Sequence, residues 1–241
     1  MANKGETKTQ KSLSAPTIRH LKRKTKVFTF KSRPGPHSKE TSVPLGFAVR
    51  DLLEVSNNLK ETKKILTEGS VKVNGTIRKD RRFPVGLFDV VEITPVKKKY
   101  RVLLDKKGRI ILTEIDFKGE TYKVSKIVNK KTGKNSKIKI TTNDGFTFEL
   151  GKEKATIGDS VKIVFPEIKM GAVYHMDKDG VAFITGGTHV GEITTVEGIT
   201  EGTLQRKKLV SLSNKDSKFQ TVTNNVYVIG KGKAEIEALQ K

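Results

Sequence analysis

Residues 42–93 constrain the fold of this chain more than any other stretch, because they combine two helical patterns with a hairpin signal. One face of a first short helix collects the apolar residues Leu45, Ala48, Val49, Leu52 and Leu53. Asn58 followed by Glu61 is the capping pattern that starts a second helix, and Gly69 suits its C-terminal stop. The buried side of this second helix is expected to be Leu59, Thr62, Ile65 and Leu66.

A hairpin and a basic run follow the two helices. Val71-Lys72-Val73 and Thr76-Ile77-Arg78 flank Asn74-Gly75, which predicts a two-residue turn between two short strands. The basic run Lys79-Asp80-Arg81-Arg82 comes directly after the hairpin, and residues 89–93 predict a return strand. The charged face of a small αβ core is often simply solvated, but cations beside a hairpin favour a phosphate-bearing partner.

This order of elements resembles the S4 domain, a small RNA-binding module shared by ribosomal proteins, pseudouridine synthases and some tRNA synthetases. The resemblance rests on the Leu52-Leu53 end of the first helix, the hairpin over 69–75 and the closing strand over 89–93. It implies that the two helices and the entry to the hairpin face RNA. The candidate RNA contacts in this module are Arg50, Lys63, Lys64, Arg78, Lys79, Arg81 and Arg82.

The formal net charge of +22 implies a polyanionic partner such as RNA, DNA or an acidic membrane surface. The net charge is +9 over residues 1–41 and +10 over 94–165, but +2 over 42–93 and +1 over 166–241. If RNA is the partner, the N-terminal arm and the middle of the chain supply most of the electrostatic attraction. The helical module then contributes position more than attraction.

The composition also excludes several kinds of site and segment. The 241 residues include no cysteine, which rules out disulfides and thiolate zinc sites. The sequence has no apolar run of about 18 residues, so no transmembrane helix is expected. The first residues are polar and basic and show no secretory signal. A cytoplasmic protein is therefore expected.

Residues 1–41 form a basic N-terminal arm whose one apolar run is Val27-Phe28-Thr29-Phe30. This composition predicts an arm that is mostly disordered when free and that orders along the phosphates of RNA. Arg33-Pro34-Gly35-Pro36-His37 predicts a rigid turn into the module. The densest basic cluster of the arm supplies the candidate RNA contacts Arg19, Lys22, Arg23 and Lys24.

Residues 94–165 predict a central β domain with a half-open, barrel-like sheet. Sixteen lysines in this segment favour one anion-binding face, although lysines on strand faces are usually just solvated. The strand patterns cover residues 100–104, 109–113, 122–129, 137–141, 146–150 and 161–164.

Residues 166–232 predict a further β domain. Val181 to Ile193 resembles the KOW motif, which is a strand, a glycine-bearing loop and a second strand inside a small SH3-like barrel. Gly187 and Gly191 have the spacing of that motif, and with His189 they are candidate loop contacts to RNA or protein. An ordinary β-hairpin would explain the same residues. A final strand is expected over 225–230, and the tail over 233–241 is expected to include a frayed helix from residue 235.

The order of these segments resembles the S4e family of small-subunit ribosomal proteins, found in archaea and eukaryotes. Ala15-Pro16, Gly35-Pro36-His37, the segment 83–90 and the segment 225–232 resemble stretches of that family. The short stretch after Gly232 favours an archaeal-type member. The resemblance implies an α+β, mostly β fold, direct binding to small-subunit rRNA beside neighbouring ribosomal proteins, and no catalysis.

The sequence contains no recognisable catalytic or metal-binding pattern. The four histidines, at positions 20, 37, 175 and 189, lack metal-ligand spacing and are expected to be surface or RNA-facing residues. Gly-Lys pairs are never followed by Ser or Thr, which excludes a Walker phosphate loop, and no GxSxG elbow occurs. We therefore expect no enzymatic activity, no metal or other cofactor, no small-molecule substrate and no membrane partner.

The leading hypothesis is a cytoplasmic, structural constituent of the small ribosomal subunit that binds rRNA and supports its folding and translation. One alternative is an rRNA-modifying or rRNA-processing factor that docks through the S4-type module, against which the missing catalytic motifs argue. The other is a basic nucleoid protein that binds duplex DNA through its charge, although the expected geometry of the module favours RNA.

Overall fold

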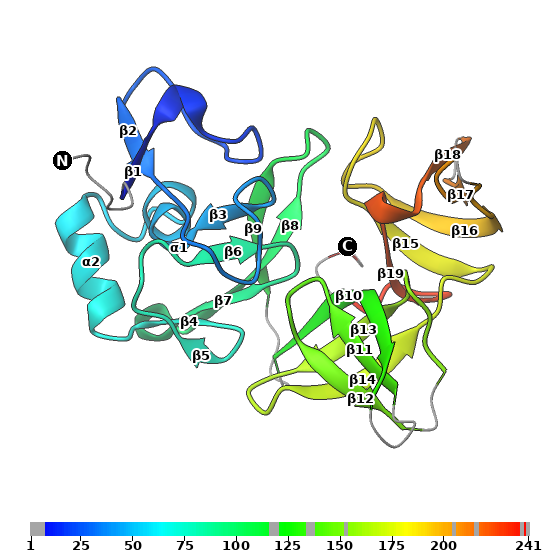
Figure 1. The fold of residues 1–241 in the computed structure, drawn as a ribbon. Helices are drawn as coiled ribbons and strands as arrows, with labels where there is room; N and C mark the ends of the chain where they lie inside the picture. Colours follow the sequence, from blue (N-terminus) through cyan, green and yellow to red (C-terminus); the bar gives the residue numbers. More distant parts are fainter. Residues whose placement is uncertain are drawn as a thin grey trace, which may run out of the picture. The chain divides into compact units, whose positions relative to one another are not determined.

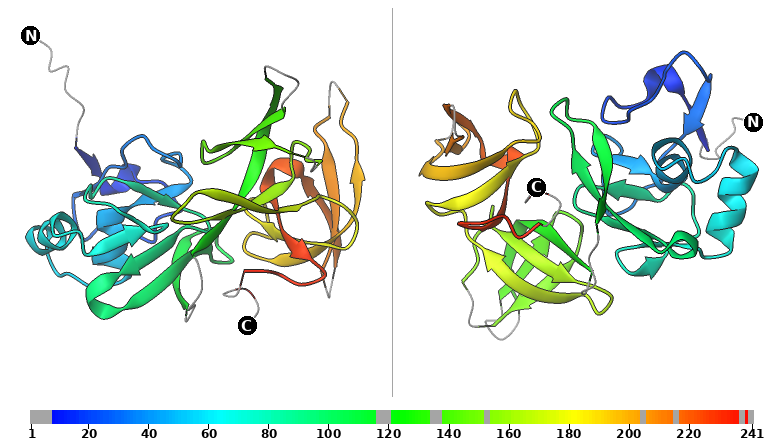
Figure 2. Two further views of the ribbon diagram at one scale, coloured as in Figure 1. Left: turned by 90° about the horizontal axis from the view of Figure 1, so that it is seen from below. Right: turned by 180° about the vertical axis from the view of Figure 1, so that it is seen from behind.

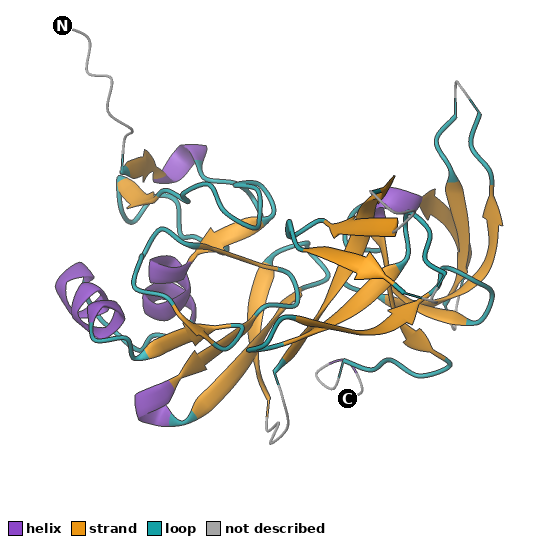
Figure 3. Ribbon diagram, turned by 60° about the horizontal axis from the view of Figure 1, so that its bottom comes forward, coloured by secondary structure: helices purple, strands orange, loops and turns teal. Residues whose placement is uncertain are grey.

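The computed structural model describes residues 8–115, 121–133, 138–151, 154–203, 206–214, 217–236 and 239. These residues divide into two compact units. The first unit holds the chain up to Leu103 together with residues 109–115, and the second holds residues 104–108 and the described residues from 121 onward. Figure 1 follows the chain through its elements, and Figure 3 shows that strands predominate, in agreement with the predicted α+β, mostly β fold class.

The N-terminal arm is folded from residue 8 onward. β1 (Thr9–Lys11) leads into η1 (Ser12–Ser14) and pairs antiparallel with β2 (Phe28–Phe30). Phe30 is buried, and the Arg19 guanidinium donates hydrogen bonds of 2.8 Å to the Phe30 carbonyl and to the Ser32 hydroxyl. The predicted disorder is therefore wrong for the described part of the arm, because one apolar ring and one buried arginine outweigh its average composition.

The first helix of the module has the predicted position but a different winding. α1 (Leu45–Phe47) continues directly as η2 (Ala48–Leu52), a π-helix that ends with a 2.9 Å hydrogen bond from the Leu53 N–H to the Ala48 carbonyl. Val49 is fully buried, whereas Leu53 is half-buried. The apolar stripe expected at α-helical spacing therefore ends early, since the wider π-turn rotates later residues out of that register.

The second helix, α2 (Leu59–Thr67), begins at the predicted cap. The Asn58 side-chain oxygen accepts a hydrogen bond of 3.0 Å from the Glu61 N–H. The expected burial of Leu59 is wrong, because this side chain is 42% exposed. The helix packs on the core through its later residues, such as the fully buried Leu66, and its first residue extends beyond that contact.

Five strands form the sheet of the module, in the order β5-β4-β7-β8-β9. A separate pair, β3 (Ser42–Pro44) and β6 (Pro84–Gly86), brings the two ends of the helix-and-hairpin segment together. The predicted turn at Asn74-Gly75 is confirmed, with φ values of 50° and 73° that match a primed two-residue turn. The sheet strands are β4 (Val71–Val73), β5 (Thr76–Ile77), β7 (Val90–Ile93), β8 (Lys98–Leu104) and β9 (Ile110–Ile115).

The strands β8 and β9 belong to this module sheet, although the sequence pattern assigned them to the central β domain. β8 pairs antiparallel with β7, with Arg101 opposite Val90. The chain reverses between the two strands at η3 (Thr94–Val96) and at Lys97, which has a φ of 54°. Since β7 presents an edge directly before this reversal, the next strand extends the same sheet.

The second unit contains two five-stranded antiparallel sheets (Figure 2). In the first sheet, of order β12-β11-β10-β13-β14, the long β10 pairs with β13 along its first half and with β11 along its second. Side chains of this sheet, among them Ile127, Ile140 and Ile163, form a buried hydrophobic core. Lys137, predicted as a strand residue, lies outside the described residues. The strands are β10 (Tyr122–Thr132), β11 (Ile138–Thr142), β12 (Thr147–Leu150), β13 (Ser160–Val164) and β14 (Lys169–Tyr174).

The second sheet of this unit has the order β18-β17-β16-β15-β19. The strand–loop–strand expected from the KOW resemblance corresponds to β15, residues 185–192 and β16, and the expected final strand is β19. Of the predicted frayed helix, residues 237, 238, 240 and 241 lie outside the described residues. The elements are β15 (Gly180–Ile184), β16 (Ile193–Thr200), β17 (Leu209–Ser213), β18 (Lys218–Val222), η5 (Thr223–Asn225) and β19 (Val226–Lys231).

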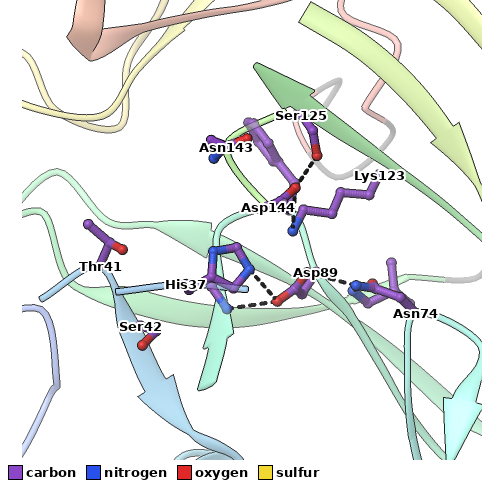
Figure 4. Close-up of polar contacts among 12 residues, drawn as sticks. His37, Thr41, Ser42, Asn74, Asp89, Lys123, Ser125, Asn143 and Asp144 are labelled. Carbon is purple, nitrogen blue, oxygen red and sulfur yellow. Dashed lines mark hydrogen bonds and ion pairs between the residues drawn. The ribbon is translucent and has the colours of Figure 1, made fainter. Parts of the chain in front are cut away.

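Two lysines of β10 are buried inside the second unit. The Lys123 amine lies 3.0 Å from the Asp144 carboxylate, which also accepts a hydrogen bond from the Ser125 hydroxyl (Figure 4). The Lys126 amine donates a 2.9 Å hydrogen bond to the Val226 carbonyl at the start of β19. Burial lowers the pKa of Lys126 to about 8. Both lysines therefore serve the fold, and the lysine count of this segment overstates its exposed positive charge.

Candidate RNA interface

An aromatic side chain of the arm supports two arginines of the module. The ring of Phe30, from β2, lies 4.7 Å from the guanidinium of Arg50 and 6.0 Å from that of Arg81. Arg50 also donates hydrogen bonds of 2.7 and 3.0 Å to the carboxylate of Asp51. A guanidinium stacked on a ring keeps in-plane N–H donors that match the oxygens of a phosphate. The arm thus helps to orient two of the candidate RNA contacts.

Further hydrogen bonds join the same two segments. The Arg33 N–H donates to the Arg82 carbonyl at 2.8 Å, and the Arg82 side chain donates to the Lys31 carbonyl at 3.3 Å. The predicted RNA contact Arg19 is 2% exposed and lies inside the first unit, where burial lowers its pKa to about 10. Its guanidinium therefore keeps its charge at neutral pH while its donors bind groups of the arm itself.

A polar groove of about 710 Å³ lies between the arm and the module. Cations from both segments line it, together with hydroxyl, amide and carboxylate groups. Glu54 on its wall has a φ of 53°, an uncommon backbone conformation for a residue with a side chain. The lining residues are His20, Leu21, Lys22, Thr25 and Lys26 from the arm and Arg50, Asp51, Leu52, Glu54, Ser56 and Asn57 from the module.

The other module candidates lie on α2 and after the hairpin. Lys63 and Lys64 are exposed on α2. Arg78 is exposed with its guanidinium 4.5 Å from the ring of Phe83, and the neighbouring Lys79 is exposed as well. An aromatic ring therefore supports a basic side chain at a second place in the first unit.

The arm candidates differ in their exposure. Lys22 and Lys24 are exposed, and Lys22 lines the groove. Arg23 is half-buried and donates a 2.9 Å hydrogen bond to the Leu13 carbonyl. The two lysines are thus accessible to a ligand, whereas Arg23 also stabilises the arm.

A buried histidine–aspartate pair fixes the turn that leads into the module (Figure 4). The His37 ring nitrogen Nε2 lies 2.9 Å from the Asp89 carboxylate, and the two side chains are 7% and 1% exposed. The Gly86 N–H and the Asn74 side-chain amide each donate a 2.8 Å hydrogen bond to the same carboxylate. The expectation of a surface or RNA-facing His37 is therefore wrong, because the ring is buried and pairs with the buried carboxylate of Asp89.

The KOW-loop candidates lie in the second unit. Gly187 and Gly191 have φ values of 101° and 80°, the left-handed backbone that motivated their selection. The ring of His189 stacks on that of Phe219 with centroids 3.9 Å apart, and it lies 3.3 Å from the Glu192 carboxylate. A Cβ added at Gly187 would meet nothing within 4 Å, so the backbone of the loop is accessible there.

Within the described ranges, no group of three or more His, Asp or Glu side chains could hold a metal ion. In the same part of the chain, no helix is long and apolar enough to span a membrane. Most residues that line the groove between the arm and the module carry charged or hydrogen-bonding side chains.

Phe30 and Lys26 are absent from the candidate residues derived from the sequence, although the Phe30 ring supports two of the candidates and Lys26 lines the groove. An isolated pair of aromatic residues in an otherwise basic segment is the signal that indicates Phe30. The groove has no comparable sequence signal, since its two walls come from segments that are far apart in the chain.

Known proteins place the chain in a family. Residues 96–170 match the model of ribosomal family S4e, and residues 4–40 match the model of the RS4NT (NUC023) domain. The small ribosomal subunit protein eS4 of Methanosphaera stadtmanae is 35% identical over 236 residues, which cover 98% of each chain. This chain belongs to the S4e family of ribosomal proteins. The family resemblance inferred from the sequence is thereby confirmed.

Two further relatives agree with this S4e assignment. The eS4 protein of Methanococcus maripaludis is 38% identical over 239 residues, covering 95% of this chain and 97% of its own. The crystal structure of the 30S ribosomal protein S4e from Thermoplasma acidophilum matches with a TM-score of 0.67 and 29% identity, over 79% of this chain and 96% of that chain. All three relatives are archaeal, and S4e is a family of ribosomal proteins rather than of enzymes.

Proposed function

We propose that this S4e protein is a structural constituent of the small ribosomal subunit and that it binds rRNA directly through its first unit. The names of its relatives, which are proteins of the small or 30S subunit, support the ribosomal part of the proposal. The stack of Arg50 and Arg81 on Phe30 supports the direct contact, since it assembles cations from two segments around one ring. The protein then acts in the ribosome, which is cytoplasmic.

The groove between the arm and the module is the centre of this contact. Lys22, Lys26 and Arg50 on its walls neutralise phosphates of the RNA backbone. Ser56 and Asn57 offer hydrogen-bonding groups to ribose hydroxyls, the feature that distinguishes RNA from DNA. Each neutralised phosphate releases bound counterions, so the affinity falls with salt by a logarithmic slope of about 0.7 to 0.9 per contact.

The remaining candidates have supporting roles in this proposal. Lys63 and Lys64 on α2, with Arg78 and Lys79 after the hairpin, extend the contact over the module. Arg19 acts as a positioning residue, because its guanidinium binds groups of the arm rather than solvent.

The second unit makes a separate contact in this proposal, through the KOW loop. The accessible backbone around Gly187 can accept or donate hydrogen bonds to a ribosomal neighbour. The near-neutral charge of residues 166–241 gives this contact a smaller dependence on salt than that of the arm.

The test removes two exposed arm charges that make no described hydrogen bond through their amines. Lys22→Gln combined with Lys24→Gln should reduce the salt slope of binding to deproteinised small-subunit rRNA by about 1.4 to 1.8, measured by filter binding at several KCl concentrations. Lys22→Arg with Lys24→Arg is the matched control and should keep the full slope. An unchanged slope in the glutamine variant removes these lysines from the contact.

The ribosomal part has its own test. The full-length protein should sediment with small subunits through a gradient at high salt, because its contacts are distributed over the arm and the module. Recovery of the protein solely at the top of the gradient contradicts this part of the proposal, whatever its affinity for isolated RNA.

A further inference from the structure

The arm presents an aromatic side chain to solvent. Phe28, the first residue of β2, is 57% exposed, whereas Phe30 two residues later is buried. Its neighbours Val27 and Leu13 are exposed as well, at 69% and 70%. The Ser12 N–H donates a 2.9 Å hydrogen bond to the Val27 carbonyl, which brings the segments of Leu13 and Val27 together. A small apolar patch therefore lies on the outside of a basic arm.

The position of Phe28 relates this patch to the cations of the interface. Residues two apart in a strand point to the same face, so Phe28 shares a face of β2 with Phe30, the ring on which Arg50 stacks. Lys11 lies directly opposite Phe28 in the β1–β2 register. Arg23 is held beside the patch by its hydrogen bond to the Leu13 carbonyl. One cation thus lies opposite the exposed ring in the strand register, and a second lies beside the patch.

The charge of the arm identifies the kind of occupant. Residues 8–39 contain ten Lys or Arg and no Asp or Glu. An apolar protein segment would cover the ring but leave these cations without counterions. A nucleotide combines a flat apolar face with a phosphate, and it satisfies the ring and the cations together. The base must be unpaired, since the faces of bases within a duplex are covered by their neighbours.

We propose that Phe28 is a stacking platform for an unpaired base of the bound RNA, with Lys11 and Arg23 placed to neutralise the adjoining phosphates. This assignment rests on the proposed rRNA binding and adds a contact of a different physical kind. Stacking is insensitive to salt, whereas the lysine contacts of the groove are not. The two kinds of contact can therefore be separated by experiment.

The first test uses affinity. Phe28→Leu keeps an apolar side chain but removes the π-face, and it should weaken binding to deproteinised small-subunit rRNA by about 5- to 150-fold, which corresponds to about 1–3 kcal/mol per stacked base. The salt slope should stay at the wild-type value, because no charge is lost. Phe28→Tyr keeps the ring and should bind within about twofold of wild type. Val27→Ala, at the neighbouring exposed position, controls for a general loss of apolar surface.

The second test uses fluorescence. The chain contains no tryptophan, so Phe28→Trp introduces a single reporter at the proposed platform. Its emission should be quenched by the rRNA and protected from iodide. Ile157→Trp, at a position of the second unit that is 62% exposed, is the control for bulk effects of RNA on emission.

The outcomes separate the two proposals. If wild type fails to bind the rRNA, the proposed function falls and the stacking proposal with it. If wild type binds with a steep salt slope but Phe28→Leu binds equally well, the stacking proposal alone is overturned. A change in the emission of Phe28→Trp in intact small subunits, with none on deproteinised rRNA, would also overturn it and would assign the patch to a neighbouring protein.

Discussion

Both units of this protein are rich in cations, but one pair of cations in each unit is used in opposite ways. In the first unit, the guanidinium groups of Arg50 and Arg81 lie on the ring of Phe30, and Arg50 also lines a polar groove. In the second, the amines of Lys123 and Lys126 are buried and bind a carboxylate and backbone carbonyls. The contrast teaches that positive charge in a sequence indicates a polyanionic partner only where the side chains reach the surface.

The largest expected effect tests the buried side of this contrast. Asp144→Ala removes the carboxylate beside Lys123, whose side chain is 3% exposed, and should lower the free energy of unfolding by about 3–5 kcal/mol, because a buried cation loses its partner. Urea denaturation followed by tyrosine fluorescence measures it, since three of the four tyrosines lie in the second unit.

The matched control for Asp144→Ala is Glu149→Ala. Glu149 pairs with Lys139 at 3.1 Å, but both side chains are about half exposed, so this variant should lose less than about 1 kcal/mol. Equal losses in the two variants would mean that burial does not distinguish the two pairs.

The second expected effect is a dependence of stability on pH. The pKa of Lys126 is about 8 in the folded protein against 10.5 in the unfolded chain, so the unfolded state binds more protons between these values. Stability should therefore rise with pH, by about 2 kcal/mol from pH 7.5 to 9.5. Urea denaturation at both pH values measures the rise. Lys126→Met should lack this contribution, and a rise of equal size in that variant would show that another group causes it.

The smallest expected effect concerns the exposed side of the contrast. Arg81→Gln removes a stacked guanidinium from the first unit and should lower the free energy of unfolding by about 0.5–1 kcal/mol, the size of one cation–π contact near the surface. In filter binding to small-subunit rRNA, the same change should lower the salt slope by about 0.7 to 0.9. Arg81→Lys should preserve the slope. A large loss of stability with an unchanged slope would place Arg81 with the buried cations instead.

Local signals in the sequence predicted those elements that need few long-range contacts. Asn74-Gly75 specifies its turn because both residues tolerate positive φ, and Asn58 caps α2 through a bond to a residue three positions away. The loop between β15 and β16 similarly depends on glycines within the motif itself. In each case the interacting groups are close in the chain.

The features that were not predicted depend on partners from distant segments. The composition of the arm gave no sign that Arg19 bonds to the Phe30 carbonyl, so both the burial of this arginine and the order of the arm were missed. The pairing of β8 with β7 depends on which sheet edge is open after the chain reverses. The groove exists only once the arm has packed on the module, and Arg50 was selected for its charge, not for its place on a ring.

The buried acid Asp89 links two segments that the sequence pattern treats as separate. Its carboxylate binds the His37 ring from the turn before the module and the Asn74 amide from the hairpin within it. A Cβ at Gly86 would lie 2.4 Å from that same ring, so the packed histidine leaves no room for a side chain at this position. A fragment that began at residue 42 would lack His37, and the buried carboxylate of Asp89 would lose the imidazole as a partner. The arm and the module therefore depend on each other for stability, since the buried carboxylate takes partners from both.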